Sequence, residues 1–372
     1  MQKPSLFANT NHSDGIYVML LINRLQILYF ILIMPAYLAE PYMVWVIIAV
    51  GLLSQLLLTF LSKWFSSRYP AMGYEGFTEL LGERKVRLLA GIGIIFIFIK
   101  MIVITIGSAD IIHQFVFPSM DRGWLILFPI IVSLYMASQG MGTTIRFIPI
   151  MFLSSIWILF LFGPFYLTEA ASLRDLYPIV PTEWTVQHWK APLFLLSALS
   201  GPEYLVCLVP WLRPERRPLT YLTIANTFSI VEYILIFIAT LLFYGSGYIR
   251  TITFPILNMG RYVQFPFFER IDVLLVSCHM IIYIYILSLL LLCFYGALRI
   301  VAGKQRAMTS RLGLIACWVL VTSCMLIIEK WFWKVGALQK FWLELQMAAG
   351  ATTYILVPVV LAIAVIRKRR IV

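Results

Sequence analysis

The chain alternates between long apolar stretches and short polar segments, from near residue 17 to near residue 367. Stretches of this length with few charged residues predict transmembrane α-helices. The ten-residue alternating segments typical of a transmembrane β-barrel are absent from the sequence. We therefore expect an all-α polytopic membrane protein. Its ten expected spans are 17–38, 42–62, 88–115, 123–139, 145–166, 191–211, 220–245, 269–298, 311–329 and 346–367.

Three of the polar segments predict short helices at the membrane surface. Segments 167–190 and 246–268 mix aromatic, proline and charged residues, as interfacial helices do. Segment 63–87, on the opposite side, contains the amphipathic stretch "YEGFTELLGERKVR". These segments interrupt the two halves of the chain at similar places. The ten spans therefore divide into five plus five, the arrangement of inverted-repeat transporters.

The composition supports the membrane class. Hydrophobic residues make up 61% of the chain and charged residues 12%, whereas soluble domains average about 25% charged residues. A soluble protein of 372 residues could not bury this much apolar surface. We expect one integral membrane domain over 1–372, with a polar N-terminal segment at 1–16 and a basic tail at 367–372.

The positive charges predict the orientation of the domain. With the N-terminus inside, the inside segments hold roughly twice as many lysines and arginines as the outside segments. Both termini are therefore expected in the cytoplasm, which agrees with an even number of spans. The net charge of +12 is assigned to cytoplasmic loops in contact with the lipid bilayer, and no nucleic acid partner is expected.

The sixth span, "APLFLLSALSGPEYLVCLVPW", contains a polar interruption near its middle. Pro202 lacks a backbone donor and clashes with the carbonyl four residues earlier, and Gly201 allows unusual backbone dihedrals. One interpretation is a proline kink satisfied by neighbouring helices. The other is a broken helix whose free backbone groups hold a small zwitterion or ion, and Glu203 beside the proline favours it.

Other charged residues lie at membrane depth, where each costs about 2.5–3.5 kcal/mol on insertion scales. Lys100 is midway along the third span and Glu232 midway along the seventh. Each could pair with a partner to hold helices together, or could line an ion or proton path. Arg24 lies off-centre in the first span between Asn23 and Gln26, and we expect it to extend toward the interface. Hydrogen bonding between helices is the other interpretation of this three-residue polar patch.

Recognised catalytic motifs are missing from the sequence. It has no HExxH, GxSxG or Walker loop, and the lone His279 is interpreted as a hydrogen-bonded core residue. We therefore expect no enzymatic activity, no cofactor and no metal site.

Several stretches, in order, resemble the GerAB family of spore germination proteins, which is related to permeases of the amino acid–polyamine–organocation superfamily. The most recognisable is "ERID" at 269–272, at the start of the eighth span. Similar matches are "LLSALSGPEYLVCLVPWLRPERR", "YMASQGMGTTIRF" and "LYPIVP". The resemblance covers about residues 20–368.

The resemblance implies a LeuT-like bundle with broken helices 1 and 6. It also implies a germinant receptor B subunit in the inner spore membrane, sensing a small nutrient such as an amino acid. Its partners would be the receptor A and C subunits. One alternative is a proton-coupled amino acid transporter, and another is a membrane enzyme or scaffold without a ligand cavity.

The candidate ligand site combines the break with nearby polar groups. Its expected residues are Gln26, Ile27, Leu28, Lys100, Ser200, Gly201, Pro202, Glu203 and Glu232. We expect Gly201, Pro202 and Glu203 to line a cavity at mid-membrane depth.

Two further expectations concern helix ends. Glu269, Arg270 and Asp272 are expected to be structural, because carboxylates at a helix N-terminus are stabilised by about 0.3–1 kcal/mol. The family's Gly-x-Gly in the first span is replaced here by Leu28 and Phe30. Their bulk should fill the space where the family's backbone opens.

Overall fold

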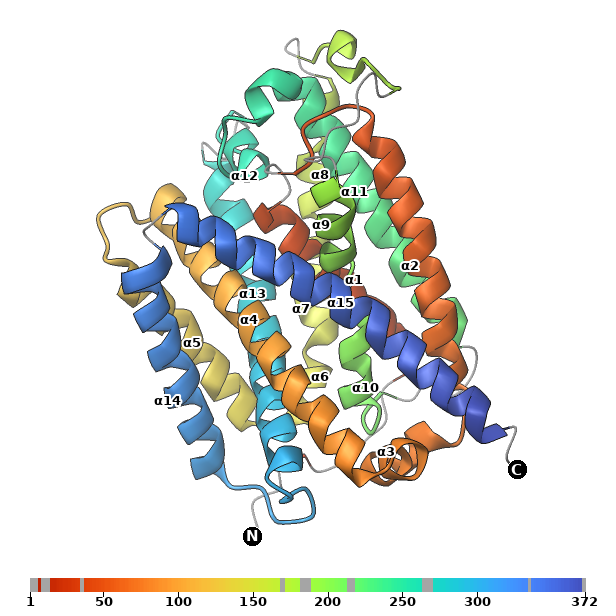
Figure 1. Cartoon of the computed structure of the whole chain (residues 1–372). Coiled ribbons are helices and arrows are strands. Elements are labelled where there is room, and N and C mark those ends of the chain that lie inside the picture. The colour runs from red at the N-terminus through yellow and green to blue at the C-terminus, as the bar shows by residue number, and fades with distance from the viewer. Residues whose placement is uncertain are drawn as a thin grey trace.

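The chain folds into a bundle of long helices, seen in a computed structural model (Figure 1). The structure describes residues 6–7, 14–33, 37–167, 171–180, 189–212, 218–262, 270–333 and 336–369. Among these residues, nine helical segments are long and apolar enough to cross a membrane. A further apolar helix, Arg122–Ser138, is shorter, with 17 residues. Nine of the predicted spans are thus confirmed, and the shorter helix lies where the span 123–139 was predicted.

The helices of the first five spans are α1 (Gly15–Ile33), α2 (Met43–Phe65), α4 (Glu83–Phe115), α5 (Arg122–Ser138), and the consecutive α6 (Met141–Arg146), α7 (Ile148–Ile156), α8 (Ile158–Leu161) and η3 (Gly163–Tyr166). Those of the second five are α9 (Lys190–Ala198) with η6 (Pro202–Tyr204) and α10 (Leu205–Leu208), α11 (Pro218–Ile249), α13 (Ile271–Val301), α14 (Arg311–Ile328) continued by η7 (Glu329–Trp333), and α15 (Gly336–Arg369).

Short helices lie in the three polar segments for which surface helices were predicted. They are η4 (Leu173–Leu176), α12 (Pro255–Met259), and the pair η2 (Tyr69–Met72) and α3 (Tyr74–Leu81). Gly82 separates α3 from α4 with φ 86°, a left-handed conformation that favours glycine. The chain can therefore turn directly from the surface helix α3 into the third span.

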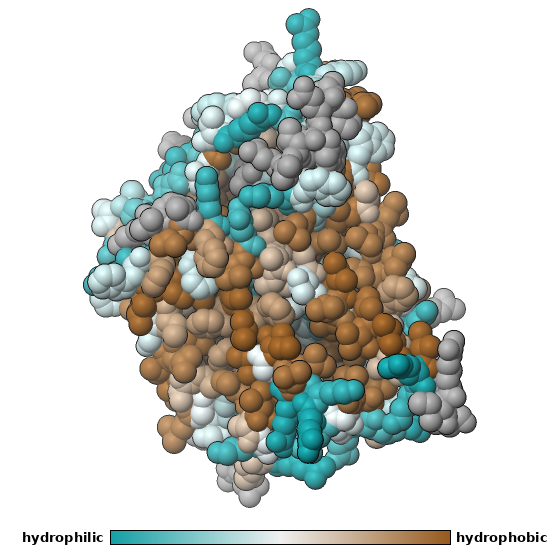
Figure 2. Space-filling model, viewed as in Figure 1, coloured by the Kyte–Doolittle hydropathy of each residue, from teal (hydrophilic) through white to brown (hydrophobic). Residues whose placement is uncertain are grey.

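The first and sixth spans lie at the centre of the bundle. The first is 83% buried and the sixth 78%, whereas Met141–Tyr166 and Arg311–Trp333 are each 33% buried. Figure 1 shows α1 and α9 behind the tilted α15, with α14 and α5 at one edge. Exposed apolar side chains form a broad band between two polar ends (Figure 2), as expected of a surface that faces lipid.

The described parts of the two chain ends lie at the same end of the bundle. The backbone N–H of Leu6 donates to Thr309 Oγ1 at 2.9 Å. Near the C-terminus, Lys368 Nζ donates to the carbonyl of Glu79 in α3 at 2.8 Å. An ion pair of 3.1 Å joins Arg306 to Glu75, so the segment after α13 also lies beside α3.

The expected break in the first span is not found within α1, which is one continuous helix from Gly15 to Ile33. Leu28 and Phe30 are both fully buried, and the ring of Phe30 stacks on Tyr233 of α11 at 3.8 Å. These bulky side chains occupy the space that an opened backbone would need. The prediction of a broken first span is therefore wrong over 15–33.

The long helix α15 crosses α9 at very short range. A Cβ atom built on Gly350 would lie 2.3 Å from Ser197 Oγ, far inside van der Waals contact. The same serine donates its hydroxyl to the carbonyl of Gln346 at 3.2 Å. Only glycine fits at this crossing, which holds the last span against the sixth.

Candidate functional site

The sixth span is broken where the sequence predicts. Helix α9 ends at Ala198, and the chain resumes as a short 3₁₀ turn at Pro202–Tyr204 before α10. Gly201 between them is extended, with φ 167°, so its dihedral is open to other residues. A Cβ atom there would lie 3.1 Å from Leu25 Cβ of α1. The close approach of α1 therefore favours glycine here, because a larger residue would displace Leu25 by a few tenths of an ångström.

The break frees three consecutive carbonyls at the end of α9, and each accepts a hydrogen bond from a different helix. The Tyr233 hydroxyl of α11 donates to Ala198 O at 3.1 Å. Gln26 Nε2 of α1 donates to Leu199 O at 2.8 Å. Lys100 Nζ of α4 donates to Ser200 O at 3.2 Å. Buried carbonyls need such partners, so the break is fixed by three other spans.

A buried ammonium and a buried carboxylate meet at the break through one hydroxyl. Lys100 Nζ donates to Ser200 Oγ at 2.9 Å, and this hydroxyl donates to Glu203 Oε1 at 2.7 Å. The other carboxylate oxygen accepts the N–H of Gly201 at 2.7 Å. Lys100 also lies 4.9 Å from the ring centre of Tyr204. Lys100 is 2% exposed and Glu203 5%, so two opposite charges share one polar site.

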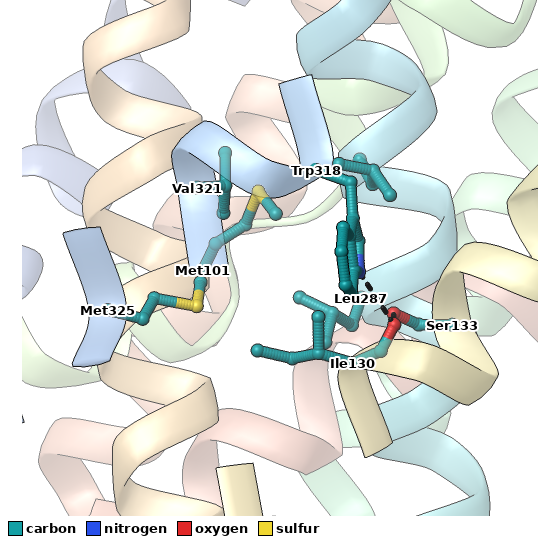
Figure 3. Close-up of a pocket in the computed structure, with 8 residues that line it drawn as sticks. Met101, Ile130, Ser133, Leu287, Trp318, Val321 and Met325 are labelled. Atoms are coloured by element: carbon teal, nitrogen blue, oxygen red, sulfur yellow. Dashed lines mark hydrogen bonds between the residues drawn. The ribbon is translucent and has the colours of Figure 1, made fainter. Parts of the chain in front are cut away.

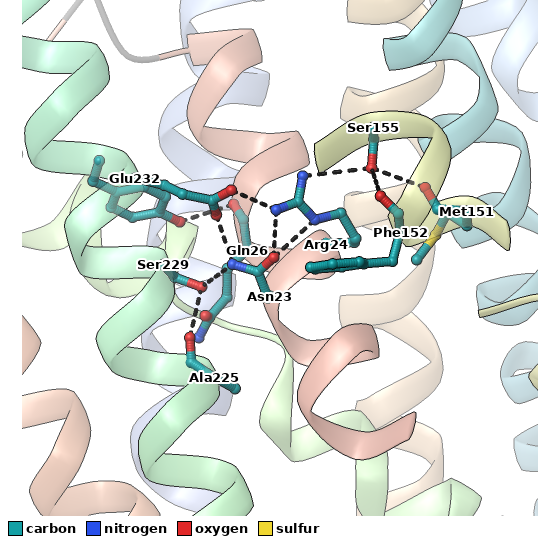
Figure 4. Close-up of polar contacts among 10 residues, drawn as sticks. Asn23, Arg24, Gln26, Met151, Phe152, Ser155, Ala225, Ser229 and Glu232 are labelled. Atoms are coloured by element: carbon teal, nitrogen blue, oxygen red, sulfur yellow. Dashed lines mark hydrogen bonds and ion pairs between the residues drawn. The ribbon is translucent and has the colours of Figure 1, made fainter. Parts of the chain in front are cut away.

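Glu232 belongs to a second polar cluster, shown in Figure 4. Its carboxylate pairs with the Arg24 guanidinium and accepts from Asn23 Nδ2 at 2.6 Å. Asn23 Nδ2 also donates to Ser229 Oγ at 3.0 Å. The Arg24 Nε donates to Asn23 Oδ1 at 2.8 Å, and Nη1 to Ser155 Oγ of α7 at 3.4 Å. The cluster therefore links α1, α7 and α11.

This second cluster corrects the interpretation of Arg24. Its side chain is 2% exposed, with its guanidinium 4.9 Å from the ring centre of Phe152. It does not extend to the interface, because Glu232 and Asn23 bind it inside the bundle. The signal in the sequence was the presence of opposite charges within the first and seventh spans.

The predicted site residues thus fall into three groups. Ser200, Gly201, Pro202, Glu203, Lys100 and Gln26 come together at the break. Glu232 pairs with Arg24. Ile27 and Leu28 are buried in the hydrophobic core. Tyr233 was not predicted, although its hydroxyl bonds both to Ala198 O and, at 2.8 Å, to the Gln26 carbonyl.

The residues at the start of α13 cap a neighbouring helix. Arg270 Nη2 donates to Asp272 Oδ2 and to Phe115 O at the end of α4, both at 2.9 Å. Arg261 Nη2 donates to Gln114 O at 3.1 Å, and its Nε lies 3.7 Å from Asp272 Oδ2. Cations at a helix C-terminus are stabilising. The arrangement supports a structural role for Arg270 and Asp272, and Glu269 lies outside the described residues.

A small cavity of about 10 Å³ lies elsewhere, between α4, α5, α13 and α14 (Figure 3). Its lining includes Met101, Leu287, Val321 and Met325. The indole N–H of Trp318 donates to the Ile130 carbonyl at 3.1 Å, so the polar groups there are occupied. This cavity has the character of a packing defect, and the predicted cavity at the break stays a prediction.

Comparisons with known proteins agree on family and fold. A family model described as spore germination protein (spore permease) matches residues 14–367. The spore germination protein GerQB of Bacillus cereus is 26% identical over 190 residues, which cover 49% of this chain and 51% of that protein. The chain thus spans about half the length of this relative.

A solved structure of a Na⁺-coupled sialic acid symporter, in its substrate-bound outward-open state, superposes with a TM-score of 0.63. The sequence identity is 14%, and the match covers 96% of this chain and 81% of the symporter. At this identity the likeness shows the fold alone. It confirms the predicted LeuT-like permease architecture.

Proposed function

This chain belongs to the spore germination protein family, and from that premise we propose that it is the integral membrane subunit of a spore germinant receptor. In this proposal the protein lies in the inner spore membrane and works with A and C receptor subunits. It senses a small nutrient, of the amino acid class, at the break in the sixth span. Binding of the nutrient starts germination.

The observation that supports this site is the buried pair of opposite charges at the break. A free amino acid carries the same two groups, an ammonium and a carboxylate. Its carboxylate would accept hydrogen bonds from the ammonium of Lys100 and the N–H of Gly201. Its ammonium would donate to the carboxylate of Glu203 and the carbonyl of Ser200. Each ligand group would then replace a hydrogen bond that the protein makes to itself.

The experiment is a germination assay on spores that carry single substitutions. Glu203→Gln and Lys100→Met remove one charge each while keeping most of the side-chain volume. We expect either substitution to abolish the response to the nutrient that the unaltered receptor recognises. Response to nutrients sensed through other receptors should persist. The matched control is Lys85→Met, since Lys85 is exposed on α4 near its polar end.

Protein amount decides how a lost response is interpreted. Immunoblots of spore membranes must show both variants at normal abundance, because a buried charge left without its partner can prevent folding. A normal nutrient response of Glu203→Gln at normal abundance would exclude the break as the sensing site. The nutrient is identified beforehand by deleting the gene and testing which nutrients still trigger germination.

The proposed orientation places both termini in the cytoplasm, because lysines and arginines concentrate at the end of the bundle that holds α3 and Lys368. We expect Asp175→Cys to react with a membrane-impermeant maleimide from outside intact cells, in a background without the native cysteines. Lys304→Cys should react only after the membrane is opened. The reverse pattern would contradict the orientation.

A second candidate is proton-coupled transport of an amino acid, which is favoured by the fold shared with a Na⁺-coupled symporter. Purified protein in proteoliposomes would then accumulate a labelled amino acid when a proton gradient is applied. A protonophore should abolish the accumulation. Binding of the amino acid without accumulation would favour the receptor over the transporter.

A further inference from the structure

Two residues near the start of the chain, Leu6 and Phe7, are bound at the end of the bundle that holds α3. The N–H of Leu6 donates to Thr309 Oγ1 at 2.9 Å. Its carbonyl accepts from the N–H of Met141, the first residue of α6, at 2.9 Å. The Leu6 side chain is 4% exposed. Both the backbone and the side chain of this residue are therefore held by elements that lie far away in the sequence.

The ring of Phe7 contacts both the end of the sixth span and α13. Its centroid is 6.1 Å from that of Trp211 and 6.1 Å from that of Tyr295, within the range of about 4.5–7 Å in which aromatic rings attract. The guanidinium of Arg299 lies 5.9 Å from the Phe7 ring centre, a cation–π distance. One ring thus joins the sixth span to α13.

Two glycines face Leu6 and Phe7. Gly140, just before α6, has φ 92°, and a Cβ atom there would lie 3.0 Å from the Leu6 carbonyl oxygen. A Cβ atom on Gly296 of α13 would lie 3.5 Å from the Phe7 ring. Apart from its chain neighbours and its own helix backbone, the described residues bring only that ring within 4 Å of this position. A large side chain at either glycine would occupy the space of Leu6 or Phe7.

The sixth span depends on outside contacts beyond its break. Its inner half, 205–212, consists of α10, which has four residues, and the turn that ends at 212. A helix this short is not stable through its own hydrogen bonds, and the break separates it from α9. The contact between Phe7 and Trp211 is therefore one of those that position this half.

We propose that Leu6 and Phe7 are an internal ligand of this aromatic site and form a latch that holds the inner half of the sixth span against α13. The site takes an apolar residue followed by an aromatic one, in a segment whose backbone offers one N–H and one carbonyl. Withdrawal of the two residues would release the inner half from α13. The latch does not depend on whether a nutrient binds at the break.

Hydrogen–deuterium exchange of the full-length protein in detergent, measured by mass spectrometry, tests the latch. Phe7→Ala removes the ring that contacts Trp211 and Tyr295. Backbone amides of 205–212 should then exchange about tenfold faster, the factor that corresponds to a loss of about 1.4 kcal/mol. Amides of α2 should exchange at the unaltered rate, which shows that the bundle is still folded. The matched control is Phe160→Ala, at a ring that is 77% exposed, and it should change neither segment.

A substitution on the opposite side of the contact gives an independent measurement. Gly296→Leu places its side chain where the Phe7 ring lies, and it should speed the exchange of 205–212 as Phe7→Ala does. The double variant should exchange no faster than either single variant, because both substitutions remove the same contact. Unchanged exchange of 205–212 in Phe7→Ala, effects that multiply in the double variant, or an equal increase in α2 would overturn the proposal.

Discussion

Substitution of Glu232 by methionine would leave the Arg24 guanidinium charged in the middle of the bundle. The two side chains are 1% and 2% exposed, so solvent cannot replace the lost partner. Asn23 Oδ1 and Ser155 Oγ would still accept from Arg24, but both are neutral. Removing one partner of a buried ion pair typically costs about 3–5 kcal/mol, and we expect a loss in that range for Glu232→Met.

The double variant Arg24→Met/Glu232→Met removes both charges and should behave differently. No charge remains buried, and two methionines have volumes similar to those of the pair that they replace. The remaining cost is the Asn23 amide, which loses its partners Arg24 and Glu232, about 1–3 kcal/mol. The Ser155 hydroxyl keeps its bond to the Met151 carbonyl. The double variant should therefore be more stable than either single variant.

The free energies can be measured by equilibrium unfolding in mixed micelles, followed by the fluorescence of the 11 tryptophans. The matched control is the surface pair Arg306 and Glu75, which are 81% and 65% exposed. The coupling free energy between those two side chains, from the same kind of double-variant comparison, should be below about 1 kcal/mol. If the free-energy losses of the two buried single variants add up to the loss of the double variant within about 0.5 kcal/mol, the two side chains are independent. The reasoning about a paired buried charge would then be refuted.

Two further substitutions test packing and helix capping. Gly350→Ala should destabilise the protein by about 1–3 kcal/mol in the same unfolding assay, because the added carbon overlaps Ser197. The control is Gly93→Ala, whose added carbon meets no atom within 4 Å, and it should be neutral or slightly stabilising. Equal losses of stability at both glycines would contradict the packing argument. Asp272→Ala should lower the amount of protein in the membrane, since Arg261 and Arg270 lose their shared carboxylate. The control Glu75→Ala, at an exposed carboxylate, should leave the amount of protein unchanged. Normal abundance with lost signalling would instead make Asp272 functional.

The spans and the break could be predicted from the sequence because each is a local property. Membrane-length apolar stretches predict helices through hydropathy alone. The break is marked by the run Ser200-Gly201-Pro202-Glu203 and not by proline alone, because Pro129 and Pro358 lie inside the helices α5 and α15. The length of the first helix was harder to predict. Its break was inferred from the family, whereas Phe30 packs on Tyr233, a residue that lies far away in the sequence.

The partners of the buried charges could not be predicted, because pairing depends on helix rotation and on which spans are neighbours. Lys100 and Glu232 both lie mid-span and were assigned to one site. Only the fold separates them, placing Lys100 beside Ser200 and Glu232 beside Arg24. The same limit explains why Tyr233 was missed, since an aromatic residue in an apolar span carries no sign that its hydroxyl will bind Ala198 O.

The three bonded carbonyls at the end of α9 have a consequence for how this protein could switch. Ala198, Leu199 and Ser200 are adjacent in the chain, but their donors come from three separate helices. A shift of the sixth span would strain all three hydrogen bonds together, because the carbonyls move as one piece of backbone while their donors stay on separate helices. Movement at the break is therefore coupled to α1, α4 and α11 at the same time. A ligand that released the end of α9 would have to replace all three donors.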